Sequence, residues 1–91
     1  MPKFVIEREM PGAGSLSKEQ LHEAAQNSCD VLNEMGTGIQ WMHSYVTDNK
    51  IYCIYNAVDE AAVKKHAEGT GLPANKISRV RAIIDPTTAE V

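Results

Sequence analysis

The sequence is poor in the residues that mark a disulfide-rich or metal-scaffolded protein. Its 91 residues contain two cysteines, Cys29 and Cys53, with no CxxC pair and no matching Cys/His spacing. Two cysteines are too few to form a disulfide scaffold, and they cannot make a structural zinc site by themselves. Their scarcity is typical of a reducing compartment, so we expect a cytoplasmic protein.

Long hydrophobic runs and an excess of positive charge are also missing. No apolar stretch approaches the roughly 20 residues that a membrane span requires. Lys3, Glu7 and Arg8 interrupt the apolar core that a signal peptide would need. Nine basic and twelve acidic residues give a net charge of -3, which argues against a nucleic-acid surface. We therefore expect no membrane partner, no nucleic-acid partner, and a single domain over residues 1–91 with an ordered core of about 3–86.

What the chain does have is centred on residues 39–56, two runs of β-branched and aromatic residues joined by Asp48-Asn49. This pattern is typical of a β-hairpin with a two-residue turn. Counting outward from the turn places Val46 opposite Ile51 and Tyr45 opposite Tyr52. Because side chains alternate along a strand, each face of the hairpin is predicted from the sequence. One face carries Trp41, His43, Tyr45, Tyr52, Ile54 and Asn56, and the other carries Met42, Ser44, Val46, Ile51, Cys53 and Tyr55.

The rest of the chain predicts two helices and two further strands. Ser17 begins a capping box before an apolar stripe that ends at Gly36, and Asp59 begins a second helix that Gly71 and Pro73 stop. Strands are expected over residues 4–9 and 76–84. The resulting order is that of a ferredoxin-like α+β fold, βαββαβ, with a four-stranded antiparallel sheet and two helices on one face.

Two helices cover only one face of such a sheet. The covered face is expected to take Phe4, Ile6, Met42, Val46, Ile51, Cys53, Val80 and Ala82. The open face is expected to present Val5, Glu7, Glu9, Trp41, His43, Tyr45, Tyr52, Ile54, Arg79, Arg81 and Ile83. So large a partly apolar surface predicts a homodimer that pairs its sheets face to face about a two-fold axis, as in a dimeric α/β barrel.

The open face also contains the residues that could bind a ligand. An imidazole with carboxylates, His43 with Glu7 or Glu9, is a suitable donor set for nickel, zinc or copper, although the same pair also occurs in structural networks. Arg79 and Arg81 are candidates either for ion pairs with these glutamates or for a fork that binds a carboxylate or phosphate. The predicted cleft is lined further by Trp41, Tyr45 and Tyr52. His66 is expected to face the core.

The chain resembles a family of small bacterial ferredoxin-like domains, some of which are nickel-binding homodimers. The resemblance spans about residues 3–86. It rests on the strand with Trp41, His43 and Tyr45, on Tyr52-Cys53, and on His66 followed by the segment Thr70-Gly71-Leu72-Pro73-Ala74. It implies a dimer joined through its sheets and metal ligands near His43. Where nickel-binding relatives can be histidine-rich, this chain has Arg8-Glu9, so Glu9 offers an oxygen donor in place of nitrogen.

Two functions from different classes follow. In the first, the protein is a small homodimeric binding protein that holds a divalent metal ion, nickel, or a small anion in the cleft between the paired sheets. In the second, it is a small dimeric α/β-barrel enzyme that acts on a small anionic substrate. His43 would then be the acid or base, and Arg81 or Tyr45 would orient the substrate. The fold alone does not choose between these functions.

Overall fold

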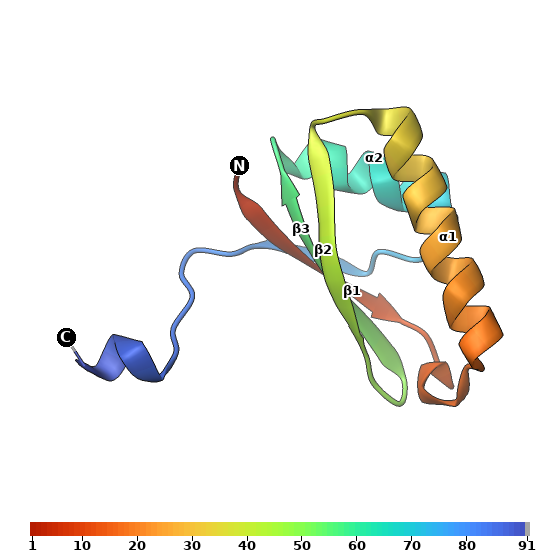
Figure 1. Ribbon diagram of the computed structural model, residues 1–91, viewed down its shortest axis with the longest axis horizontal. Coiled ribbons are helices and arrows are strands. Elements are labelled where there is room, and N and C mark those ends of the chain that lie inside the picture. The colour runs from red at the N-terminus through yellow and green to blue at the C-terminus, as the bar shows by residue number, and fades with distance from the viewer. Residues whose placement is uncertain (91) are drawn as a thin grey trace.

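The computed structural model describes residues 1–90, which form one four-stranded sheet with two helices packed on the same face (Figure 1). The strands are β1 (Lys3–Glu9), β2 (Ile39–Val46), β3 (Lys50–Ala57) and β4 (Lys76–Arg79), and the helices are α1 (Lys18–Met35) and α2 (Glu60–Thr70). The strand order is β2-β3-β1-β4, with every pair antiparallel. This confirms the predicted ferredoxin-like α+β fold. Neither helix of residues 1–90 is long and apolar enough to cross a membrane.

Both helices begin and end at the predicted residues. The Ser17 backbone N–H donates to Gln20 Oε1 at 2.9 Å and the Gln20 N–H donates to Ser17 Oγ at 3.1 Å, which completes the capping box. Asp59 accepts a hydrogen bond from the Ala62 N–H at 2.9 Å at the start of α2. Gly36 and Gly71 end the helices with φ angles of 83° and 72°, which glycine adopts without steric cost.

The hydrophobic core lies between the helices and the sheet. In β1 and β3 every second residue is buried and faces the helices, while the residues between them are partly exposed on the other face. The buried strand residues pack with Val63 and Ala67 of α2. They include Phe4, Ile6, Ile51, Cys53 and Tyr55. The face opposite the helices is called the open face below.

The hairpin has the predicted register next to its turn but not at its far end. Val46 pairs with Ile51 and Tyr45 with Tyr52, as predicted. A register shift then pairs His43 with Ile54 and Trp41 with Tyr55, which makes Met42 the extra residue of a β-bulge. A bulge reverses the alternation of side chains beyond it.

The faces predicted for two hairpin residues are therefore wrong. Trp41 faces the helices, where its Nε1 donates to Ser44 Oγ at 3.0 Å. Met42 lies on the open face and is half exposed, and its sulfur accepts a hydrogen bond from Asn56 Nδ2 at 3.4 Å.

The last strand is shorter than predicted and has the opposite phase. β4 ends at Arg79 because its partner β1 begins at Lys3, whose carbonyl accepts the last cross-strand bond, from the Val80 N–H at 2.8 Å. Ile77 pairs with Ile6, and Arg79 pairs with Phe4. Arg79 is therefore on the covered side, and the prediction that it shares the open face with His43 is wrong. Val80, Arg81, Ala82 and Ile83 lie beyond the strand.

Residues 80–90 form an arm that extends away from the body of the domain and ends in a short 3-10 helix, η2 (Pro86–Glu90) (Figure 1). Ile83 and Ile84, predicted to belong to the last strand, are 70% and 80% exposed on this arm.

Candidate functional site

Two rows of side chains cross the open face. Residues directly opposite each other in antiparallel strands point to the same side of a sheet. One row consists of His43, Ile54, Val5 and Ser78, and the next consists of Tyr45, Tyr52, Glu7 and Lys76. The structure therefore places His43, Tyr45, Tyr52, Ile54 and Glu7 on one face, as predicted.

His43 is held by a neighbour on its own strand. Its Nε2 lies 3.0 Å from the Tyr45 hydroxyl oxygen, and the two rings meet edge to face with centroids 5.0 Å apart. Tyr45 is 58% exposed and His43 is also exposed. A hydrogen bond at one imidazole nitrogen orients the ring and leaves the other nitrogen as a possible metal donor. In this arrangement that second nitrogen is Nδ1.

Glu7 and Glu9 are paired with a lysine and not with the predicted arginines. Lys50 Nζ lies 3.3 Å from Glu9 Oε1 and 3.9 Å from Glu7 Oε1. The hydrogen bond and the negative charge of Glu9 raise the pKa of Lys50. Such exposed ion pairs contribute little to stability, so a stronger ligand could replace Lys50 as the partner of either carboxylate.

One chain does not bring the predicted metal ligands together. Within residues 1–90, no group of three or more histidine, cysteine, aspartate or glutamate side chains could hold a metal ion. His43 and Glu7 lie two strands and one row apart, which corresponds to roughly 12 Å between Cα atoms at ordinary sheet spacings. A complete coordination shell for a metal at His43 must therefore include donors from outside this chain.

The remaining predicted ligand residues lie elsewhere. Arg79 and Arg81 line a shallow hollow near the start of α2, together with Phe4, Asp59 and Glu60. The two arginines are thus close to acidic residues and on the other side of the sheet from His43. Trp41 lines a separate cavity under α1.

The structure also contains a buried polar cluster that was not predicted from the sequence, which we call the Arg8 cluster. It consists of Arg8, Tyr55 and His66, all on the covered side of the sheet and all nearly inaccessible to solvent. Arg8 Nη1 donates to the carbonyls of Pro73 at 3.0 Å and Leu72 at 3.4 Å. His66 Nε2 lies 3.0 Å from the Tyr55 hydroxyl. Two buried nitrogens, Arg8 Nε and His66 Nδ1, have no hydrogen-bond partner.

The electrostatics of the Arg8 cluster leave one net positive charge. Burial raises the pKa of Tyr55 to about 12. Burial and the nearby charge of Arg8 lower the pKa of His66 to about 4. Both rings are therefore neutral at pH 7, and the guanidinium remains charged because its pKa lies far above that. The sequence offered one signal, since Arg8 continues the alternation of Phe4 and Ile6 and must share their buried face.

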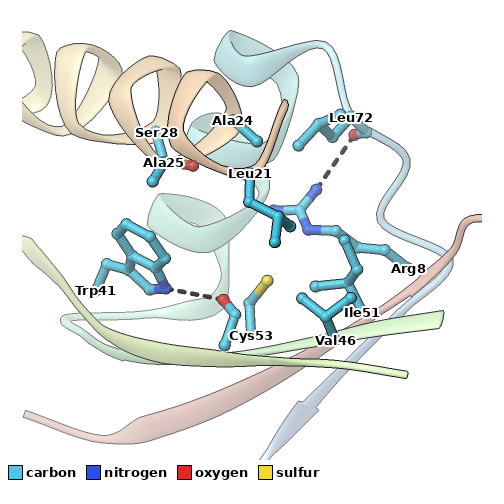
Figure 2. A pocket seen from close by; sticks show the side chains of 11 residues that line it. Arg8, Leu21, Ala24, Ala25, Ser28, Trp41, Val46, Ile51, Cys53 and Leu72 are labelled. Atoms are coloured by element: carbon cyan, nitrogen blue, oxygen red, sulfur yellow. Dashed lines mark hydrogen bonds between the residues drawn. The ribbon is translucent and has the colours of Figure 1, made fainter. Parts of the chain in front are cut away.

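A cavity of about 90 Å3 lies between α1 and the sheet, with Arg8 in its wall (Figure 2). Figure 2 shows the guanidinium beside Leu21, turned toward the Leu72 carbonyl, with Trp41 on the opposite side of the cavity. Most of the other walls are apolar. They include Leu21, Ala24 and Ala25 of α1 and Val46, Ile51 and Cys53 of the sheet.

Comparisons with known proteins identify relatives of this chain. Residues 4–80 match the family model described as "Nickel responsive protein SCO4226-like". Among curated proteins, no sequence matches the chain. A crystal structure of SCO4226 from Streptomyces coelicolor A3(2) is similar, with a TM-score of 0.75 and 22% sequence identity over 90% of this chain and 99% of that one. At this identity the structural match supports the shared fold alone.

Proposed function

The chain belongs to the family of nickel responsive SCO4226-like proteins, and from this premise we propose that it is a homodimeric metal-binding protein. In this proposal the open faces of two copies pair about a two-fold axis. A divalent metal ion, nickel, is bound where they meet. His43 is the main ligand, and Glu7 and Glu9 are the candidate oxygen donors.

The observation that carries the proposal is the placement of His43. It is a donor oriented by Tyr45 on the open face, yet no complete ligand group forms within the described part of one chain. A two-fold axis near His43 would bring two imidazoles together, because a symmetric interface presents the same residues from both copies. The site would then be complete only in the dimer.

The donor types fit nickel. Imidazole nitrogen binds nickel, zinc and copper well, and carboxylates add harder oxygen donors. The two copies together supply two His43 rings and four carboxylates from Glu7 and Glu9. Tyr45 would act as the partner that fixes the ring of His43, since metal-binding histidines usually have a hydrogen bond at their second nitrogen. A bound metal would supply the positive charge that these carboxylates receive from Lys50 in the single chain.

The surface around His43 supports dimerisation. Tyr45 and Met42 are large and exposed, and Val5, Tyr52 and Ile54 are partly exposed between them. A contiguous, partly apolar surface of this kind is typical of a protein interface. Complete burial of a fully exposed large apolar side chain contributes roughly 1.5–3 kcal/mol, and these partly exposed side chains would each contribute a fraction of that.

The test is calorimetric titration of nickel chloride into the wild type, His43→Ala and His22→Ala. His22 is exposed on α1, so His22→Ala is the matched control for the loss of one surface imidazole. We expect saturable binding by the wild type and His22→Ala, with one or two metal ions per dimer, and a loss of at least tenfold in affinity for His43→Ala. Equal binding by His43→Ala and the wild type would exclude His43 as a ligand. An absence of nickel binding by the wild type would exclude the proposed function.

A further inference from the structure

Arg8 is a buried cation without a buried anion. It exposes 1% of its surface, and none of the ion pairs within residues 1–90 includes it. Its two carbonyl partners, from Leu72 and Pro73, carry only partial charges. Burying a charge is costly unless an opposite charge or a full set of hydrogen bonds compensates it. Arg8 has neither, since Nε lacks any partner.

Its neighbours in the core do not supply the missing charge. The charge of Arg8 acts on the rings of Tyr55 and His66, and both rings are neutral at pH 7 because burial raises the pKa of Tyr55 and lowers that of His66. Within the Arg8 cluster the guanidinium is therefore an uncompensated positive charge, and Arg8 lines the cavity under α1 (Figure 2).

We propose that this cavity is a binding site for a small monocarboxylate with a short apolar tail. The carboxylate would contact the guanidinium of Arg8, and the tail would lie along Ile51 and Cys53 toward Trp41. The site is on the covered side of the sheet, so it is separate from the proposed metal site and does not depend on it.

The size and walls of the cavity select this class of ligand. A volume of about 90 Å3 holds roughly six to nine water-sized groups, at 10–15 Å3 for each. That is enough for a carboxylate and a chain of a few carbons, and too little for a nucleotide or a sugar phosphate. The walls away from Arg8 are mainly alkyl and aromatic, and pockets of this kind hold an apolar body while one polar group fixes its orientation.

The test uses Trp41, the only tryptophan of the chain, as a fluorescent probe in the cavity wall. The wild type is titrated with sodium hexanoate and with hexanamide, which has a similar shape but no charge, at constant ionic strength. We expect a saturable change in Trp41 fluorescence with hexanoate and binding of hexanamide that is at least tenfold weaker, as for the loss of a charged hydrogen bond. Equal affinities for the two compounds, or no saturable binding of hexanoate, would overturn the proposal.

Two variants assign the signal to this cavity. Arg8→Met keeps an unbranched stem but removes the guanidinium and its charge, and it should lose the preference for hexanoate over hexanamide. Ala25→Leu fills the cavity from α1 and keeps Arg8, so it should abolish binding of both compounds. Ala61→Leu, at an exposed position of α2, is the control for the added volume and should bind as the wild type does. If Arg8→Met does not fold, unchanged hexanoate binding by Ala25→Leu would still contradict the proposal.

Discussion

The Tyr55 hydroxyl oxygen lies 3.0 Å from Nε2 of His66, and this hydrogen bond joins β3 to α2 inside the core. The two rings are tilted by 60° with centroids 5.0 Å apart, and His66 has no exposed surface. Both rings are neutral at pH 7, so the bond costs no buried charge. A proton added to His66 would create a second cation beside Arg8.

This pairing makes stability depend on pH. The pKa of His66 is lowered to about 4 in the folded state, and in the unfolded chain it should be near 6.5. The unfolded state therefore binds more protons between these values, so the free energy of unfolding falls as the pH falls from 6.5 to 4. The loss from His66 should be up to about 3 kcal/mol, at 1.36 kcal/mol for each pKa unit.

Urea unfolding of the wild type, His66→Gln and His22→Gln at several pH values between 4 and 7 measures this contribution. His66→Gln keeps a hydrogen-bonding side chain that does not titrate, and its stability should change less with pH than that of the wild type. His22→Gln removes an exposed histidine and should follow the wild type. If the free energy of unfolding changed equally with pH in the wild type and in His66→Gln, His66 would not be the cause of the pH dependence.

The fold was predictable because local signals and long-range pattern agree. The Ser17 capping box, the glycines after each helix and the apolar stripes define the helices, and alternation in residues 4–9 and 50–57 defines the buried face. The short turn fixes the register near Val46 and Ile51, since few pairings are compatible with two loop residues. His66 was predicted to face the core because it lies on the inner stripe of its helix, and the structure confirms this placement.

The site was less predictable because small irregularities change which residues share a face. The bulge at Met42 turns Trp41 from the open face to the helices. Neither tryptophan nor methionine is a sequence signal for a β-bulge, so the reversal could not be predicted. The phase of β4 depends on its pairing with β1, which the four residues of the strand do not specify locally. Arg8 was missed because a charged residue near the end of a strand is usually exposed.

Ile54→Lys should prevent dimerisation. Ile54 lies between His43 and Val5 in one of the two rows that cross the open face. The substitution would place a charge in each half of the proposed interface. Light scattering at micromolar concentrations should give a dimer for the wild type and a monomer for the variant. Val58→Lys replaces an exposed aliphatic residue that lies outside the four strands, and this variant should remain dimeric. A monomeric wild type would contradict the prediction directly.

Gly69→Ala should destabilise the fold although Gly69 is inside α2. Alanine favours a helix over glycine by about 1 kcal/mol. The added Cβ, however, would lie 2.7 Å from Val31 Cγ1 of α1, and overpacking of this kind costs about 1–3 kcal/mol. Thermal unfolding should therefore show a lower midpoint for Gly69→Ala. Val31→Ala in the same chain should restore part of the loss, and a stabilising effect of Gly69→Ala alone would show that the helices separate easily.

Arg8→Met should raise the pKa of His66. Burial and the charge of Arg8 together lower this pKa to about 4. Removing the charge leaves burial as the main cause, so the pKa should rise but remain below the ordinary value of about 6.5. NMR titration of the His66 ring protons measures the shift. Lys50→Met, which removes an exposed charge on the open face, is the control and should leave the pKa of His66 unchanged.

The same NMR titration in the presence of hexanoate offers a second check. A carboxylate bound at Arg8 would offset the charge of the guanidinium. Hexanoate should therefore raise the pKa of His66 in the wild type but not in Arg8→Met.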